Sequence, residues 1–412
     1  MENKQARQLV LVDKTAIFFL VTSISSLTAW NLLEYFKEFD ANTIFAFRFI
    51  SICFFLYSSY KLLIDFKFES KYFKNIFYLF ILYECITVIR VWPFSFDELI
   101  NLFQAPYIFW PFVIPLFVFF DKRIPTLLLL TKWIYRLGLF FLLLVVVYPS
   151  LLLDRILAQN VIATFAYGCG FLLLIANYLS NKKVNISFLV IFLGAISLTY
   201  LARRNGMFTL GAFIISGYFL NALNKSRTAF FRVFPLIIGI GVLLFFIFDN
   251  FSSALTKELE QRITKDSRSE IFKMYFLEIN NFMVFGKGMN GTYYFPSGVN
   301  DDGSIIDVDE RNVVENGYLQ LMLSGGIVHI VLFLLVMLPA AINGIFKSSN
   351  QFTKACSVMI LLWLLDMIIF GLPGLSLHYV LVWICVGICY KPSIRNKEDH
   401  ELKAKFRKLD LI

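Results

Sequence analysis

The chain has 412 residues, of which 58% are hydrophobic and 16% are charged, and its formal net charge is +9. Soluble domains carry about 25% charged residues, so this composition excludes a soluble globular protein and indicates a membrane protein with several spans. The positive charge does not indicate nucleic-acid binding, because basic residues gathered in short segments on one side of a membrane explain it.

Apolar runs of 18 or more residues recur along the chain, and each is long enough to cross about 30 Å of hydrocarbon as a helix. They predict an all-α polytopic membrane protein with about twelve transmembrane helices. In chain order we expect these helices at 15–36, 41–64, 72–92, 98–120, 125–149, 156–180, 184–202, 207–223, 230–248, 317–346, 354–372 and 375–391.

The pattern predicts one membrane domain with one inserted segment. Transmembrane helices 1–9 are expected in 1–248, an extracytoplasmic loop subdomain in 249–317, helices 10–12 in 318–391 and a basic cytoplasmic tail in 392–412. Within the loop, 252–281 has helical spacing, which predicts short amphipathic helices. Three glycines that follow predict irregular backbone, namely Gly286, Gly288 and Gly291.

The basic residues predict the orientation. If the N-terminus is cytoplasmic, the cytoplasmic segments hold most of these residues, whereas the opposite short loops hold few, among them Lys37, Arg90 and Arg155. This bias places both termini in the cytoplasm. The same count places the 249–317 loop and Arg203-Arg204 together on the outer face.

Arg203 and Arg204 follow a predicted helix at its outer end. Arginines often anchor helix ends at the membrane interface, but this pair lies on the face that the charge bias leaves poor in basic residues. Because guanidinium groups match phosphate oxygens bidentately, anion binding is the favoured interpretation. Arg268 lies in the loop. Taken alone, it is consistent with an ordinary solvated arginine that pairs with Asp266 or Glu270.

Glu315 directly precedes Asn316 and the helix expected from Gly317. The helix dipole favours a carboxylate there, which is consistent with a capping role. It is equally consistent with a general base at the membrane face, with Asn316 as a hydrogen-bond partner. His378, near the outer end of the last helix, is the alternative base.

Five charged residues lie within or near apolar runs, where charges usually face a partner or a wet cavity. Ion pairing is expected for them, with Arg48 as a candidate second phosphate contact; the others are Glu84, Lys132, Arg136 and Asp366. The acidic run at 301–310 lacks the ligand order of a calcium loop and is expected to be solvated. The six cysteines all fall in apolar runs, which is typical of buried small side chains, so we expect no metal site.

The order of these features resembles one family. An outer arginine motif at a helix end and a long outer loop are followed by Phe-Gly-Lys-Gly at Phe285–Gly288, Glu-Asn-Gly-Tyr-Leu-Gln at Glu315–Gln320, and Gly325-Gly326. This order is similar to that of the O-antigen polymerase and O-antigen ligase superfamily of bacterial surface-polysaccharide assembly. The resemblance covers topology across the chain, but specific motifs only from about 200 to 326.

The resemblance implies a GT-C type glycosyltransferase of the bacterial inner membrane, with its active site on the periplasmic face. Its substrates would be sugars linked to undecaprenyl pyrophosphate, whose charge Arg203 or Arg204 and Arg268 would neutralise. Ligases have a His-Asn pair where this chain has Glu315-Asn316, and that departure favours a polymerase in which Glu315 is the base. The anomeric configuration would invert.

The same resemblance implies no cofactor and no metal, because the donor already carries its leaving group. The implied partners are the undecaprenyl-pyrophosphate-linked oligosaccharide, membrane lipids, a flippase and a chain-length regulator, and no nucleic acid. Two alternatives stay open. An O-antigen ligase would transfer the glycan to lipid A–core, and a lipid-linked oligosaccharide flippase would carry its charges in a central cavity and lack a long outer loop.

Overall fold

The computed structural model describes residues 14–26, 41–63, 68–91, 95, 109–120, 124–201, 203–222, 267–278, 280, 282–299, 305–372 and 374–407. The first helix is Lys14–Ser26. The others in the N-terminal half are α2 Ala41–Leu63, α3 Lys71–Ile89, α5 Trp110–Val113, η1 Ile114–Phe120, α6 Ile124–Val147, η2 Pro149–Leu152, α7 Arg155–Val161, η3 Ile162–Ala166, α8 Tyr167–Leu174, η4 Ala176–Tyr178, α9 Asn181–Tyr200 and α10 Arg204–Ala222. The remaining elements are α13 Ser267–Glu278, β1 Tyr293–Val299, β2 Ile305–Arg311, α14 Gly317–Phe346, α15 Gln351–Ile369, α16 Leu377–Cys389, α17 Pro392–Arg395 and α18 Asp399–Arg407.

Among the described residues, six helices are long and apolar enough to cross a membrane. The chain therefore has the character of an all-α membrane protein. They are Lys71–Ile89, Leu127–Val147, Leu157–Leu174, Asn181–Tyr200, Gly317–Phe346 and Gln351–Ile369. Four further apolar helices are shorter, at Lys14–Ser26, Trp110–Phe119, Gly206–Asn221 and Leu377–Cys389. Twelve full spans and a GT-C arrangement therefore remain predictions, and the helix expected at 230–248 lies outside the described residues.

Two predicted spans differ from regular helices. The run at 98–120 is described only from 109, and there Pro111 and Pro115 cannot donate helical hydrogen bonds, so a four-residue helix passes into the 3₁₀ helix η1. The run at 156–180 forms α7 and α8 with the π-helical turn η3 between them and the 3₁₀ turn η4 after them. Apolar length alone predicted neither change of helix type.

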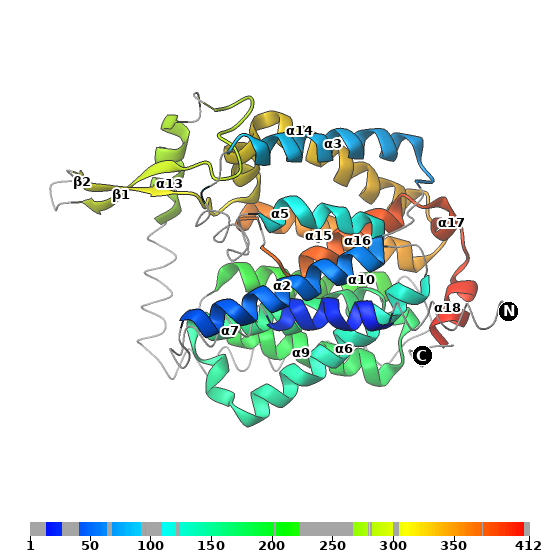
Figure 1. The fold of residues 1–412 in the computed structure, drawn as a ribbon. Helices are drawn as coiled ribbons and strands as arrows, with labels where there is room; N and C mark the ends of the chain where they lie inside the picture. The colour runs from blue at the N-terminus through cyan, green and yellow to red at the C-terminus, as the bar shows by residue number, and fades with distance from the viewer. Residues whose placement is uncertain are drawn as a thin grey trace.

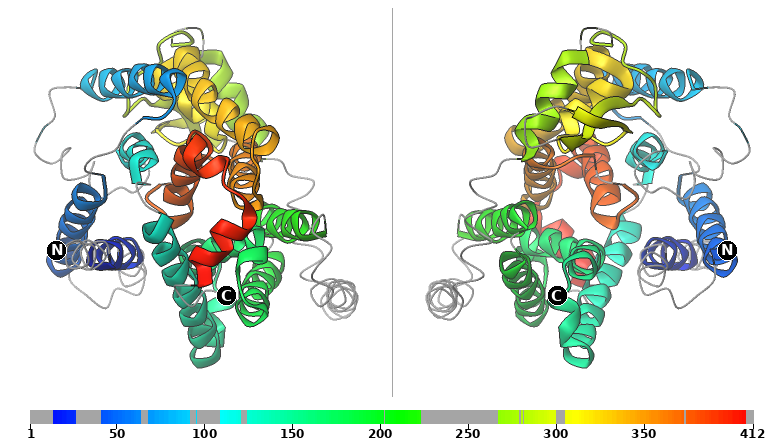
Figure 2. Two further views of the ribbon diagram at one scale, coloured as in Figure 1. Left: turned by 90° about the vertical axis from the view of Figure 1, so that its right-hand side faces the viewer. Right: turned by 90° about the vertical axis from the view of Figure 1, so that its left-hand side faces the viewer.

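The helices form three layers (Figure 1 and Figure 2). The middle layer contains η1, α15 and α16, and every residue of α16 is buried. α3 and α14 pack on one side of this layer, whereas α6, α8, α9 and α10 pack on the other. A helix that is apolar on all faces belongs at such a centre, so α16 is the core of the bundle.

The two ends of the bundle carry different structures. α13 and the hairpin β1–β2 lie at one end, and α17 and α18 lie at the opposite end (Figure 1). The hairpin is antiparallel, pairs Tyr293 with Arg311 and is irregular around Gly298. This two-stranded sheet departs from the all-α prediction, and residues 305–310 of the acidic run, expected to be a loop, belong to its second strand.

The C-terminal tail, expected to be a basic and polar extension, packs against the bundle. Leu402 and Phe406 of α18 are buried, and the Phe406 ring lies 5.0 Å from the ring of Tyr178. The Tyr178 hydroxyl donates a hydrogen bond to the Asp399 carboxylate. Burial, followed by this carboxylate, raises the pKa of Tyr178, so the hydroxyl stays a neutral donor that fixes the tail.

Asn350 connects the tail to α15, and its replacement by alanine is expected to destabilise the protein by about 2 to 4 kcal/mol. The side chain accepts from Thr353 N as the helix N-cap, and its amide donates to the carbonyls of Ile394, Arg395 and Lys397. Alanine removes the cap and all three hydrogen bonds from the Asn350 amide to the tail. The measurement is the thermal unfolding midpoint of the detergent-solubilised chain.

The matched control for this substitution is Asn396→Ala, which removes an exposed amide in the same segment. Its unfolding midpoint is expected to equal that of the unchanged chain. Equal midpoints for Asn350→Ala and Asn396→Ala would contradict the role assigned to Asn350.

Candidate functional site

The start of α14 is fixed against the end of α15. Asn316 is the N-cap of α14, and its side chain accepts from the backbone N–H groups of Tyr318 and Leu319. Its amide donates to the Ile368 carbonyl at 2.8 Å, and Gly317 N donates to the Phe370 carbonyl at 2.8 Å. The Glu315-Asn316 turn therefore lies at the C-terminal end of α15.

α10 begins at the same end of α15. The Thr209 hydroxyl donates to the Asp366 carboxylate at 2.5 Å, near the last turn of α15. Arg203 and Arg204 form the turn that opens α10, and Arg203 is half-buried. The arginine turn and the Glu315-Asn316 turn are thus both attached to the last turns of one helix.

His378 belongs to the same end of the bundle, because it lies in the first turn of α16, which follows α15. The residue is 6% exposed, and its ring lies between those of Tyr167 and Phe213, with ring centres 5.7 Å apart in each case. Within the described chain neither ring nitrogen has a hydrogen-bond partner. A Cβ on Gly206, two residues after Arg204, would lie 3.1 Å from the Tyr167 hydroxyl, which joins His378 to the arginine turn through Tyr167.

The Phe285–Gly288 motif is hydrogen-bonded to the backbone directly before Gly325-Gly326. Lys287 N donates to the Leu323 carbonyl at 2.7 Å, and Gly288 N donates to the Ser324 carbonyl at 2.8 Å. These contacts occur where α14 is interrupted at Gly326, which has φ 68° and ψ −166°. Phe285–Gly288 therefore fills the break in α14, which the sequence predicted as one continuous helix.

α3 supports this junction from the other side. Arg90 donates to the carbonyls of Phe285 and Gly286, and the Tyr83 hydroxyl donates to the Gly325 carbonyl. Irregular backbone has carbonyls that lack helical donors, and these two side chains satisfy them. The sequence identified Arg90 only as a rare outer-face cation, and nothing in it indicated Tyr83.

Three buried polar side chains, Ser324, His329 and Glu84, are linked in sequence next to the break in α14. His329 Nε2 lies 3.0 Å from Glu84 Oε1, and His329 Nδ1 lies 3.3 Å from Ser324 Oγ. The exposed fractions are 1% for His329, 4% for Glu84 and 3% for Ser324. The side-chain partner of Glu84 is thus His329 of α14. His329 was not among the predicted site residues, although a histidine three residues after Gly325-Gly326 in an apolar run was a usable signal.

The hairpin and α13 are attached to the first turn of α14. The Tyr275 hydroxyl donates to the Leu319 carbonyl at 2.9 Å, and the Tyr293 hydroxyl donates to the Val313 carbonyl at 3.2 Å. Burial raises the pKa of Tyr293, with Arg311 opposing and Glu315 adding to the shift. The Glu315 carboxylate is therefore close enough to the hairpin to affect it electrostatically.

An ion pair stiffens the same subdomain. Lys287 Nζ lies 2.7 Å from Glu278 Oε2, and the second oxygen of Glu278 accepts from Tyr294 N at 2.7 Å. Lys287 also donates to the Thr292 carbonyl at 2.6 Å. Lys287 of the Phe285–Gly288 motif thus links α13 to β1, a role that the motif alone did not indicate.

The sequence-predicted site residues fall into two groups. Arg203, Arg204, Glu315, Asn316 and His378 gather around the end of α15, where Glu315 is exposed and Asn316 is occupied as a cap. Arg268 lies in the first turn of α13, and Arg48 is a half-buried residue of α2, a helix that packs on η1. Chemically, the first group offers the exposed carboxylate of Glu315, the buried imidazole of His378 and the half-buried side chain of Arg203. Across the described ranges, no three His, Cys, Asp or Glu side chains are placed to hold a metal ion.

Comparison with family models, curated proteins and solved structures finds no match for this chain.

Proposed function

We propose that the chain is a membrane glycosyltransferase that polymerises a surface polysaccharide on undecaprenyl pyrophosphate. The observation that supports this most is the gathering of Arg203-Arg204, Glu315-Asn316 and His378 around the end of α15. A lipid-linked sugar donor needs cations for its pyrophosphate and a base for the acceptor hydroxyl, and this end of the bundle offers both. The subdomain of α13 and the hairpin lies beside it, attached to the first turn of α14.

In the proposed reaction, Glu315 accepts the proton of a hydroxyl at the acceptor's non-reducing end. The oxygen forms a bond to the anomeric carbon of the donor glycan, and the bond from that carbon to the pyrophosphate oxygen breaks. Undecaprenyl pyrophosphate leaves from the opposite face, so the configuration inverts. Arg203, Arg204 and Arg268 stabilise the charge that develops on the leaving group, with Arg48 as a second phosphate contact.

Glu315 suits the role of base because its carboxylate is exposed, whereas Asn316 holds the turn. His378 is the alternative, with two buried ring nitrogens that have no partner in the described chain. Asp366, which accepts from Thr209, is assigned to structure.

The proposal is tested with the purified full-length chain and undecaprenyl-pyrophosphate-linked repeat units, with product length measured on a gel. Glu315→Gln is expected to reduce polymerisation by about 10²- to 10⁴-fold, and Arg203→Ala and Arg268→Ala are expected to reduce it as well. Glu398→Gln, an exposed carboxylate at the end of the bundle that holds α17 and α18, is the matched control and is expected to keep full activity.

Other results would redirect the assignment. Activity that survives Glu315→Gln and is lost in His378→Gln would move the base to His378. Product formed only after lipid A–core is added would identify a ligase. Movement of the lipid-linked unit across vesicles without any glycan transfer would identify a flippase.

A further inference from the structure

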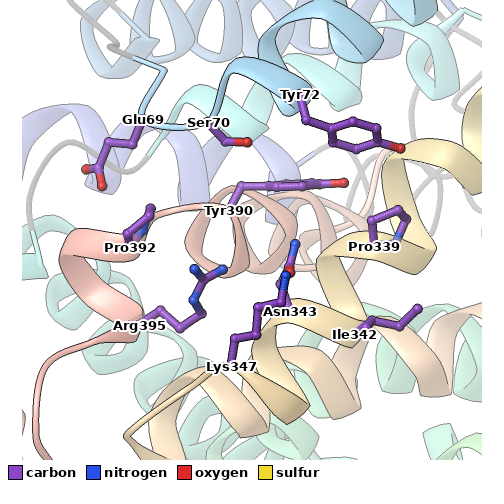
Figure 3. Close-up of a pocket in the computed structure, with 10 residues that line it drawn as sticks. All are labelled: Glu69, Ser70, Tyr72, Pro339, Ile342, Asn343, Lys347, Tyr390, Pro392 and Arg395. Atoms are coloured by element: carbon purple, nitrogen blue, oxygen red, sulfur yellow. The ribbon is translucent and has the colours of Figure 1, made fainter.

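A pocket of about 510 Å³ (Figure 3) opens beside α17, at the end of the bundle opposite the hairpin (Figure 1). It lies between the start of α3, the last turns of α14 and the junction of α16 with α17. Its lining includes Glu69, Tyr72, Asn343, Lys347, Tyr390 and Arg395. None of these residues belongs to the candidate site around the end of α15.

The pocket has a net positive charge. Arg395 donates from one guanidinium nitrogen to the Cys389 carbonyl at 3.3 Å, and its Nε is buried without a partner in the described chain. The side chains of Lys347 and Arg395 extend from different helices toward the same space (Figure 3). Glu69 also lines the pocket and keeps its negative charge, but its two oxygens accept hydrogen bonds from Ser393, and within the described chain it forms no ion pair with Lys347 or Arg395. The lining therefore has two cations and one anion.

The hydroxyl groups of the two tyrosines in the pocket already donate hydrogen bonds to carbonyls of α14. Pro339 has no N–H, so the Leu335 carbonyl loses its helical donor, and the Tyr72 hydroxyl donates to it at 3.0 Å. The Tyr390 hydroxyl donates to the Val336 carbonyl at 2.9 Å. The groups that remain for a ligand include the two cations and the amide of Asn343, all of which can donate to an anion.

An apolar surface continues from the pocket along α14. Leu335, Leu338, Ile342 and Phe346 are exposed, and the exposed fraction of Phe346 is 79%. They recur every three or four residues, so they form one face of the helix, and Ile342 also lines the pocket. A ligand that fits both features has an anionic head and an apolar body.

We propose that this pocket binds the phosphate of an anionic phospholipid, with Arg395 and Lys347 on the phosphate and the acyl chains along the exposed face of α14. Guanidinium groups match phosphate oxygens bidentately, and an ammonium adds a point charge. The lipid bridges α3, α14 and α17, so it fixes the folded tail to the bundle. The site is independent of the proposed glycosyltransferase activity.

The test measures lipid binding to the detergent-purified full-length chain by native mass spectrometry. Phosphatidylglycerol is titrated in one arm, phosphatidylcholine in a second and inorganic phosphate in a third. We expect binding of phosphatidylglycerol that Arg395→Gln and Lys347→Gln each weaken about tenfold or more. Lys182→Gln, which removes an exposed charge from α9 in the opposite outer layer, is expected to leave binding unchanged.

Lys347→Gln separates binding from folding, because the Lys347 side chain is exposed and makes no hydrogen bond or ion pair within the described chain. Its unfolding temperature without lipid is expected to match that of the unchanged chain. Equal binding of phosphatidylcholine, or unchanged phosphatidylglycerol binding in both variants, would overturn the proposal. Inorganic phosphate that competes for the site as strongly as the lipid would overturn the lipid assignment.

Discussion

Gly326→Ala is expected to destabilise the protein by about 2 to 6 kcal/mol, the sum of backbone strain and a steric clash. Gly326 has φ 68° and ψ −166°, a conformation that is essentially restricted to glycine. A Cβ at this position would lie 2.1 Å from the Val284 carbonyl oxygen. Because that oxygen belongs to backbone, it cannot move aside as a flexible side chain would.

The measurement is the unfolding midpoint of the purified chain, with Gly211→Ala as the matched control. Gly211 lies inside α10 and has no atom within 4 Å of an added Cβ, so alanine there is expected to stabilise the helix slightly, by about 0.5 to 1 kcal/mol. If Gly326→Ala unfolds at the temperature of Gly211→Ala, the break in α14 is not part of the native fold.

Gly286, on the segment that packs into the break in α14, gives an independent check. Gly286 has φ +68°, and a Cβ there would lie 2.4 Å from Gly325 N. Gly286→Ala is therefore expected to destabilise the chain as well. The double variant is expected to lose less than the sum of the two single losses, because both substitutions disrupt the same junction.

The sequence predicted the two glycine motifs but not their pairing. A glycine indicates that a backbone position needs special dihedral angles or close approach, and it says nothing about which segment approaches. The order of Phe285–Gly288 and Gly325-Gly326 was therefore readable, while the hydrogen bonds between them depend on how α3, α14 and the loop meet. Helix positions were more predictable, because apolar runs of fixed length determine them.

The hairpin shows a second limit of sequence reasoning. Ile305–Arg311 alternates apolar and acidic residues only in part, and β1 contains Pro296 and Gly298, both of which weaken a strand pattern. The acidic residues favoured a solvated loop instead. The basic-residue count predicts Arg203-Arg204 and Glu315 on one outer face of the membrane, and that placement stays a prediction. What the structure describes is that both turns are attached to the last turns of α15.

His329→Leu is expected to destabilise the protein by about 3 to 5 kcal/mol, because breaking a buried pair leaves one polar partner without compensation. Glu84 Oε1 lies 3.0 Å from His329 Nε2, and Glu84 Oε2 has no hydrogen-bond partner in the described chain. Leucine at 329 would leave the carboxyl group of Glu84 buried among apolar side chains. It would also remove the contact of Ser324 with His329 Nδ1.

A double-mutant cycle distinguishes the interaction between Glu84 and His329 from the general effects of each substitution. Glu84→Leu/His329→Leu is expected to unfold at a higher temperature than His329→Leu alone, because replacing both partners removes the uncompensated group. His400→Leu is the matched control, since His400 Nδ1 lies 3.1 Å from Glu398 Oε2 with side chains 75% and 71% exposed, and exposed pairs contribute little. A cycle in which the two single losses simply add would show that Glu84 and His329 are not coupled, and the three linked polar side chains next to the break would then have no part in holding α3 to α14.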